Sequence, residues 1–389
     1  MNDDLLRWRE EFPILERTVY LNSNSLGPMP RGVRDQLGAF MDQWDQRGVR
    51  AWLDDDGWWD MPVTVGDLLC DILNAPHGTI SMHQNVSVAE SVILSCLTFD
   101  APRNKIVYTD MNFPSVMYIM EEQRRRGARV VEVPGSDDGV SVDLDRLLEA
   151  IDEETLIVPV SHVLFRSSYI QDAAAIVKRA HEVGAMVILD IYQSAGCVPV
   201  DLQALDVDMA VGGSVKWLCG GPGAGYLYVR PDVAEQLKPT YTGWQAHARP
   251  FDFERGATKW GELAYRFLNG TPHVPALFAA KTGYEMIREI GVDRIRARSL
   301  HLTQTLLDAA AAADIPVTCP EDQEHRGGTV ALNSPDGKAV CDELNRRDFV
   351  CDYRPEAGIR LGPHFFVTED ECRSVVDEIV KILKQRGLR

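Results

Sequence analysis

A lysine in a glycine-rich turn follows an apolar segment that ends in an acid. The turn reads GGSVKWLCGGPGAG over residues 212–225 and contains Lys216, and the segment reads AMVILDI over residues 185–191 and contains Asp190. A continuous apolar run of this kind is typical of a parallel strand covered on both faces. Ligands of such sheets bind at the carboxyl ends of the strands. Asp190 and Lys216 are therefore expected to meet at one site.

This pair of side chains has the chemistry that pyridoxal 5'-phosphate requires. An amine holds the aldehyde of that cofactor as a Schiff base, and a carboxylate keeps the ring nitrogen protonated so that the ring accepts electrons. Most lysines are solvated surface charges, and an acid at a strand end often caps the next turn. The order of Asp190, Gln193 and Lys216 along the chain favours the cofactor over these two alternatives.

The surrounding pattern alternates strands with helices and predicts an α/β fold. Residues 170–184 have helical apolar spacing, with Asp172 as the N-cap and Gly184 as the stop signal. We expect a large, mostly parallel sheet domain sandwiched by helices, followed by a small C-terminal α+β domain. The predicted strands are residues 105–108, 129–133, 156–160, 186–191, 209–212 and 225–229.

Three segments are expected along the chain. Residues 1–50 form an N-terminal segment that packs with the small domain, residues 51–282 form the large cofactor-binding domain, and residues 283–389 form the small domain. The small domain is expected to begin with one long helical connector over residues 283–313. Its last helix opens at TEDE, residues 368–371, which is a capping-box signature.

Composition argues against several classes of partner. The 389 residues carry a formal net charge of −18, which leaves no basic excess to neutralise nucleic-acid phosphates. No apolar stretch approaches the length of a membrane span, and the chain starts without an apolar signal segment. The eight scattered cysteines show no zinc-ligand spacing. We expect no metal, and a cytoplasmic protein with reduced thiols.

Several short motifs narrow the prediction to one family. They are YLNSNSLG at residues 20–27, GWWDMP at 57–62, FPS at 113–115, GWQAH at 243–247 and the lysine turn itself. Together they resemble the kynureninases, which belong to the class-V aminotransferase group of fold-type I pyridoxal phosphate enzymes. The resemblance runs from about residue 18 to residue 275, and more loosely to the end of the chain.

The resemblance implies which residues hold the cofactor. Lys216 binds its aldehyde, Asp190 pairs with its ring nitrogen, and Phe113 stacks on its ring. The phosphate is expected at the start of a helix over residues 86–94, because backbone N–H groups at a helix N-terminus favour an anion. The other cofactor-binding residues expected within the same chain are Gln84, Asn85, Gln193 and Ser214.

Three further residues match segments that reach the phosphate from the neighbouring subunit in this group. They are Trp244, Asn269 and Thr271. The resemblance therefore implies a homodimer with shared active sites, and two-fold dimers are the commonest assembly of soluble proteins. If these residues act across the subunit boundary, neither chain has a complete site by itself.

The substrate is expected to be a small amino acid. Arg360, in the run GIRLGPH at residues 358–364, matches the family's arginine for the α-carboxylate, and a guanidinium fork suits that group. Asn24 and Ser25 are the other predicted substrate contacts. Phe165 and Arg166 follow a predicted strand, in a loop that is expected to face the site.

The chain departs from the kynureninase pattern at two positions. Val215 stands where kynureninases carry a tyrosine, and valine cannot donate a proton. Gln193 stands where kynureninases carry a histidine, and glutamine at that position is typical of the cysteine desulfurases. The nucleophilic cysteine of the desulfurases would fall near Phe365, so persulfide chemistry is disfavoured.

Three functions are compatible with these residues. The first is kynureninase-like cleavage, by hydrolysis or elimination, at the β- or γ-carbon of an L-amino acid through an external aldimine. The second is that of a class-V aminotransferase or epimerase, which breaks only the Cα–H bond. Such an enzyme needs no acid that protonates a departing side chain, so Val215 is compatible with it. The third is a cofactor-binding regulatory protein, which is disfavoured because no DNA-binding domain is recognised at either end.

Overall fold

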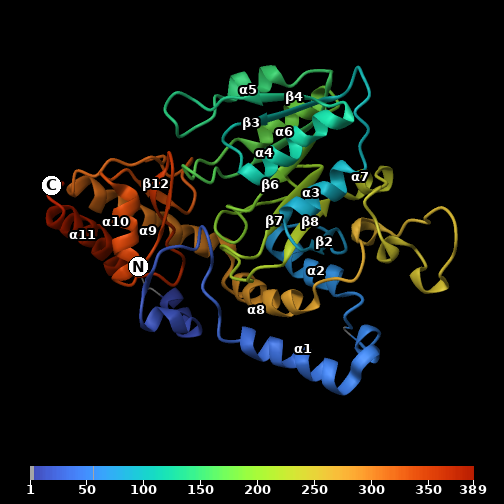
Figure 1. Cartoon of the computed structure of the whole chain (residues 1–389), viewed down its shortest axis with the longest axis horizontal. Coiled ribbons are helices and arrows are strands. Elements are labelled where there is room, and N and C mark those ends of the chain that lie inside the picture. The colour runs from blue at the N-terminus through green and yellow to red at the C-terminus, as the bar shows by residue number, and fades with distance from the viewer. Residues whose placement is uncertain (1–3, 56) are drawn as a thin grey trace.

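The computed structural model describes residues 4–55 and 57–389, so residues 1–3 of the predicted N-terminal segment and residue 56 of the predicted large domain lie outside the described residues. A seven-stranded sheet with the order β2-β8-β7-β6-β5-β3-β4 forms the centre of the larger part (Figure 1). Its strands are β2 (Ile80–His83), β3 (Lys105–Thr109), β4 (Arg129–Val133), β5 (Thr155–Ser161), β6 (Met186–Asp190), β7 (Met209–Gly213) and β8 (Gly225–Val229).

The mostly parallel character of this sheet is confirmed. β8 runs antiparallel to β2 and β7, and the other neighbouring strands pair in parallel. β8 follows β7 without a crossover helix, so it returns beside β7 in the opposite direction. The turn between them holds Lys216 at the end of the sheet where β6 also terminates. The six predicted strands are present, whereas the short strand β2 was not predicted.

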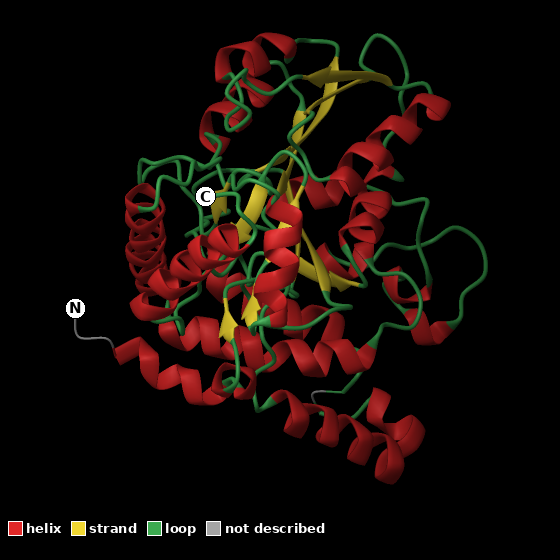
Figure 2. Ribbon diagram, turned by 60° about the vertical axis from the view of Figure 1, so that its left-hand side comes forward, coloured by secondary structure: helices red, strands yellow, loops and turns green. Residues whose placement is uncertain are grey.

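Helices cover both faces of the sheet (Figure 2). Successive residues of β6 face opposite sides: Val187 and Leu189 pack in one apolar cluster, and Ile188 packs in the other. This explains why the strand is apolar at every position. Among the described residues, no helix has the length and apolar character needed to span a membrane. The helices of this part are α2 (Met61–Leu73), α3 (Val86–Leu94), α4 (Pro114–Glu121), α5 (Leu144–Ala150), α6 (Ala173–Glu182), α7 (Pro231–Gln236) and α8 (Val274–Ile290).

Local signals set the ends of several helices. The Asp172 side chain accepts a hydrogen bond from the Ala175 backbone N–H at 2.9 Å, so it caps α6 as predicted. The long helical connector predicted over residues 283–313 is helical, but it is divided at Gly291, where α8 ends and α9 (Val292–Ala312) starts. Gly291 has a φ of +85°, a conformation that favours glycine and ends a helix.

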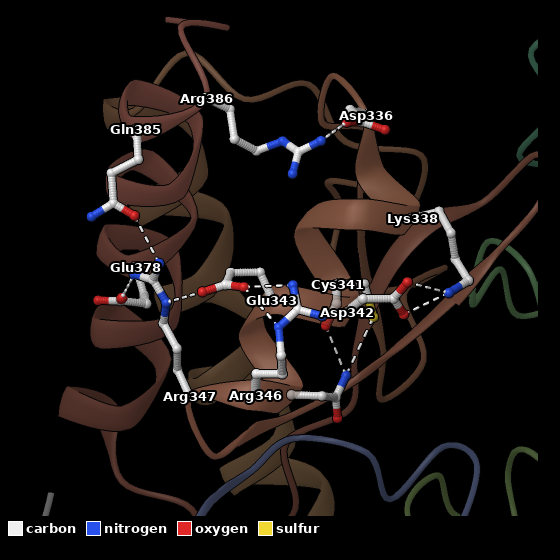
Figure 3. A network of polar contacts seen from close by, with 11 residues as sticks. Asp336, Lys338, Cys341, Asp342, Glu343, Arg346, Arg347, Glu378, Gln385 and Arg386 are labelled. Atoms are coloured by element: carbon white, nitrogen blue, oxygen red, sulfur yellow. Dashed lines mark hydrogen bonds and ion pairs between the residues drawn. The ribbon is translucent and has the colours of Figure 1, made fainter.

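The C-terminal part is a small α+β unit. Its antiparallel sheet has the order β11-β12-β9, formed by β11 (Asp352–Arg354), β12 (Gly358–Leu361) and β9 (Val330–Leu332). Helices α10 (Gly337–Arg346) and α11 (Glu369–Gln385) pack together, and the predicted capping box opens α11. Arg347 joins the two helices through Glu343, Glu378 and Gln385, at 2.6–2.7 Å (Figure 3).

The N-terminal residues lie against both parts of the molecule. β1 (Val19–Tyr20) pairs in parallel with β10 (Phe349–Val350), while α1 (Val33–Arg47) packs against α8. Between β1 and α1, the chain passes the carboxyl end of the large sheet, where the Gln193 side chain donates a hydrogen bond to the Asn24 carbonyl at 3.0 Å. The segment that carries Asn24 and Ser25 is thereby brought to the predicted site.

Candidate active site

A cavity of about 180 Å³ opens at the carboxyl end of the large sheet. It is lined by residues from the ends of β5 and β6, the turn after β7, and the first turns of α3 and α4. The predicted site residues on its wall are Asn85, Phe113, Asp190, Gln193 and Lys216. Residues that lie far apart in the sequence therefore converge where a doubly wound sheet places its ligand.

The Lys216 amine lies between aromatic rings. Its Nζ atom is 5.6 Å from the ring centroid of Phe113 and 4.3 Å from that of Tyr192. Lys216 is partly exposed because it borders the cavity. Burial nevertheless lowers the pKa of its amine to about 8, although the charge of Asp190 acts to raise this pKa. Among the described residues, nothing forms a hydrogen bond or ion pair with this amine. It is available to react with an aldehyde.

Asp190 is a buried carboxylate that lacks a cation in contact. Its Oδ1 atom accepts a hydrogen bond from the Tyr192 backbone N–H at 2.9 Å. Burial raises the pKa of Asp190, and the Tyr192 N–H and the charge of Lys216 oppose this rise. Glu90 on α3 is also buried, and burial, together with the charge of Asp190, raises the pKa of Glu90 well above the ordinary range. A positively charged group in the cavity would stabilise the Asp190 carboxylate.

Two of the predicted cofactor residues are held by other protein groups. The Gln193 amide donates to the Asn24 carbonyl and accepts from the Trp217 Nε1–H, both at 3.0 Å. The Ser214 hydroxyl bonds to the Ala224 carbonyl at 2.5 Å and to the Tyr284 hydroxyl, and it does not line the cavity. Gln193 is therefore fixed in orientation beside the cavity, and the role of Ser214 stays a prediction.

The start of α3 separates two cavities. The Asn85 side chain caps α3 by accepting a hydrogen bond from the Val88 backbone N–H at 3.0 Å. Asn85 also lines the Lys216 cavity. Gln84 lines a small neighbouring cavity of about 30 Å³ together with Asn269. The N–H groups at the start of this helix can bind an anion, as expected for a phosphate. Both side-chain assignments stay predictions.

Within one chain, the residues predicted to act across a dimer do not reach the Lys216 cavity. Trp244 is 42% exposed, and its ring lies 4.6 Å from that of Trp59. Thr271 is exposed, and Asn269 donates a hydrogen bond to the Tyr241 carbonyl. The proposed contribution of Trp244, Asn269 and Thr271 needs a second subunit, and it stays a prediction.

Arg360 is buried at the junction of the small sheet and the large part. Its guanidinium forms a fork with Asp352, at 2.8 and 2.5 Å, and donates to the Phe165 carbonyl at 2.6 Å. Phe165 lines the cavity, and the charge of Arg360 is one of the influences that lower the pKa of Lys216. Arg360 is thus close to the cavity, but a substrate carboxylate would have to share it with Asp352.

Asn24 presents an unpaired amide. It is fully buried, and neither atom of its side-chain amide has a hydrogen-bond partner among the described residues. Buried polar groups normally have a partner, so a bound molecule would satisfy this one. Ser25 follows in the same turn and is partly exposed. Substrate binding by Asn24 and Ser25 stays a prediction.

The family can now be identified. The model of the aminotransferase class-V family matches residues 64–363. The chain belongs to the class-V aminotransferase family. Kynureninase from Pseudomonas fluorescens is 28% identical, over 99% of this chain and 94% of that protein. Kynureninase from Bacillus anthracis is 30% identical, over 98% and 92%. An uncharacterized aminotransferase, YcbU of Bacillus subtilis, is 29% identical, over 96% of each. The resemblance predicted from the motifs is confirmed.

Solved structures show the class-V fold as well. A cysteine desulfurase from Thermococcus onnurineus NA1 superposes with a TM-score of 0.84 at 20% identity, covering 97% of this chain and 98% of that one. The cysteine desulfurase CsdA from Escherichia coli gives a TM-score of 0.84 at 18% identity, covering 98% and 99%. These identities are low, so the likeness establishes the fold alone. The predicted fold-type I architecture is confirmed.

Pyridoxal 5'-phosphate is the cofactor of class-V enzymes, and the residues of this chain fit it. Lys216 offers a free amine, Asp190 a buried carboxylate that lacks a cation, and Phe113 an aromatic ring, all on one cavity. When bound, the cofactor supplies a ring that accepts electrons from the substrate. No group of acidic, histidine or cysteine side chains in the described part of the chain could hold a metal ion.

Two residues of this class-V site were not predicted. Tyr192 stands between Asp190 and Gln193 in the sequence, so its neighbours gave a signal that it lies at the site. Asp352 contacts Arg360 across the β11–β12 pair, where the register places the two residues opposite each other. That pairing depends on how two short strands meet, which the sequence pattern of residues 352–361 does not reveal.

Proposed function

We propose that this class-V enzyme cleaves a bond at the β- or γ-carbon of an L-amino acid, in the manner of the kynureninases. The observation that carries the proposal is the Lys216 amine, which borders the cavity beside Asp190 and has its pKa lowered to about 8. Such an amine is a base of suitable strength for a Cα proton near neutral pH. The full-length similarity to two kynureninases supports the choice of bond.

Each residue of the site has a separate task in this proposal. Lys216 would hold the cofactor through its aldehyde until a substrate amine replaces it, and the freed amine would then take the proton from Cα. Asp190 holds a proton at the ring nitrogen of the cofactor. Arg360 attracts the substrate carboxylate, and the ring of Phe165 closes one wall of the cavity.

The departing side chain needs a proton from a donor other than the tyrosine that kynureninases carry beside the lysine. Val215 has no proton to give, although kynureninases resembling this chain carry a tyrosine there. Either the side chain that leaves differs from an aryl ketone, or water in the cavity supplies the proton. This position favours a second candidate, a class-V aminotransferase or epimerase, which breaks only the Cα–H bond. The similarity to YcbU, which is described as an aminotransferase, supports this alternative.

Product analysis tests the first candidate against the second. The holoenzyme is incubated with L-kynurenine or 3-hydroxykynurenine, and release of the anthranilate and alanine is followed. Cleavage is expected to form both products with repeated turnover and without a keto acid. Accumulation of pyridoxamine phosphate with consumption of a keto acid would support transamination, and Cα–H exchange into deuterated water without a new product would support racemisation. Either result without anthranilate, or no reaction with either compound, would overturn kynurenine cleavage.

We also propose a homodimer with shared active sites in a reducing compartment such as the cytoplasm. The segment that carries Trp244 also presents exposed rings at Tyr241, Phe251 and Phe253, which an interface would cover. All eight cysteines are free, as in a reducing compartment.

Mixing two inactive variants tests the shared site. Lys216→Ala subunits and Trp244→Ala subunits are expected to form hybrids in which one site has both residues intact. Activity should recover to roughly a quarter of that of the unmodified enzyme after random exchange, because half the dimers are hybrids with one complete site. No recovery despite subunit exchange, shown by native mass spectrometry, would mean that Trp244 acts within its own subunit or only in packing.

A further inference from the structure

Tyr192 contacts both residues on which the cofactor depends. We infer that Tyr192 is a positioning residue, whose ring holds the Lys216 amine at the cavity while its backbone holds Asp190. This inference rests on the proposed cofactor site, and it does not depend on which substrate bond is broken. The aromatic ring, and not the phenolic hydroxyl, is the working part of the side chain.

The first support is the position of the ring. Its centroid lies 4.3 Å from the Lys216 Nζ atom, closer than that of Phe113 at 5.6 Å. An ammonium group at this distance is attracted to the negative face of an aromatic ring. Because no other side chain among the described residues binds this amine by a hydrogen bond or ion pair, the two rings are its main local contacts. Tyr192 itself lines the same cavity.

The second support is the backbone of the same residue. The Tyr192 N–H donates to the Asp190 Oδ1 atom at 2.9 Å. This bond fixes the carboxylate two residues earlier, at the end of β6, and favours its charged form. A shift of Tyr192 would therefore disturb the lysine and the carboxylate together.

The third support is the space that the chain leaves for the ring. A Cβ atom on Gly213 would lie 2.5 Å from the Tyr192 Cζ and hydroxyl oxygen atoms, which is far inside contact distance. Gly213 is the last residue of β7, and its φ is not in the left-handed region. The backbone conformation at residue 213 would therefore allow any residue. Only glycine leaves room for the ring of Tyr192.

The hydroxyl has no comparable contact. It forms no hydrogen bond with any described residue, and burial, together with the charge of Asp190, raises the pKa of Tyr192 to about 12. The phenol therefore stays protonated over the working range of an enzyme. A phenylalanine in its place would keep the ring, the volume and the contact with Lys216.

The test compares Tyr192→Phe with Tyr192→Leu in the full-length holoenzyme, without substrate. The visible absorbance of the bound cofactor is titrated with pH, because it reports protonation of the nitrogen that joins it to Lys216. Loss of the ring disfavours the cation, so Tyr192→Leu is expected to lower the midpoint by about half a pH unit to one unit. Tyr192→Phe should keep the midpoint. Tyr118→Leu, at a tyrosine that is 70% exposed, is the matched control.

A second variant tests the role of the Tyr192 ring in case Tyr192→Leu fails to fold. Gly213→Ala should displace the Tyr192 ring and lower the midpoint in the same direction. In the double variant Gly213→Ala/Tyr192→Leu, the alanine no longer meets the ring. Its own effect on the midpoint should then largely disappear, and this non-additivity measures the coupling between the two residues. Cofactor affinity, measured by fluorescence titration, should fall by roughly 2- to 30-fold in Tyr192→Leu and Gly213→Ala.

Two outcomes would overturn the inference. If Tyr192→Leu and Gly213→Ala both titrate like the unmodified enzyme, the ring does not act on Lys216. If Tyr192→Phe shifts as far as Tyr192→Leu, the hydroxyl is the working part. None of these measurements uses a substrate, so failure here leaves the proposed reaction standing. Conversely, failure of the kynurenine assay leaves this inference intact.

Discussion

Replacing Lys216 with alanine is expected to lower turnover at least about a thousand-fold. The amine has two proposed tasks that no neighbouring side chain can take over, which are to bind the cofactor aldehyde and to accept the Cα proton. Its partners in the cavity are aromatic rings and a carboxylate, and none of these is a base of comparable strength. The visible absorbance of the joined cofactor should be lost as well.

The measurement compares steady-state rates of Lys216→Ala and the unmodified enzyme with whichever amino acid proves to be the substrate. Lys238→Ala removes an exposed lysine and is the matched control. Thermal unfolding of both variants checks that the fold is retained. A Lys216→Ala rate within ten-fold of the unmodified enzyme would show that another group supplies the base, and the assignment of Lys216 would then be wrong.

Asp190→Asn is expected to reduce turnover by about a hundred- to a thousand-fold while the cofactor still binds. The amide has nearly the same shape, and its oxygen can still accept the Tyr192 N–H. The asparagine cannot carry the negative charge that is proposed to keep a proton on the ring nitrogen of the cofactor. The ring then accepts electrons poorly, so loss of the Cα proton slows.

This prediction is checked by measuring turnover and cofactor content on the same samples. Asp100→Asn, at an exposed aspartate, is the control for removal of a carboxylate. A variant that loses the cofactor altogether would assign Asp190 to binding, and one with full activity would remove it from the site. Slow turnover of the Cα–H bond at full occupancy is the expected result, and deuterium exchange at Cα measures it directly.

The large sheet was readily predicted because burial on two faces leaves a continuous apolar run in each inner strand. β2 was not predicted: it has four residues, and it runs directly into the start of α3. Gly291 shows a different limit. A single glycine within a helical pattern is tolerated or ends the helix, and only the packing of α8 and α9 decides between the two.

The site was predictable where chemistry restricts the residue type and uncertain where geometry decides. Lys216 and Asp190 have few substitutes for the tasks predicted for them, and the structure places both on one cavity, as the strand and the turn indicated. The Arg360 guanidinium is different, because its contacts depend on tertiary structure. Cross-strand register places Asp352 beside it, and the packing of the small sheet against the large part places the Phe165 carbonyl beside it. Residues such as Trp244, which is predicted to complete a site on another subunit, are beyond what one chain displays.

The pairing of β1 with β10 bears on how this chain can be made. Val19 pairs with Phe349, so β1 waits for a partner strand that is synthesised much later in the chain. Until then, the strand that leads into the turn of Asn24 has no partner strand in the small unit. Slow, non-local closure of this kind exposes apolar surface for the whole time of synthesis. Production of the enzyme should therefore benefit from low temperature, which weakens the association of exposed apolar surface.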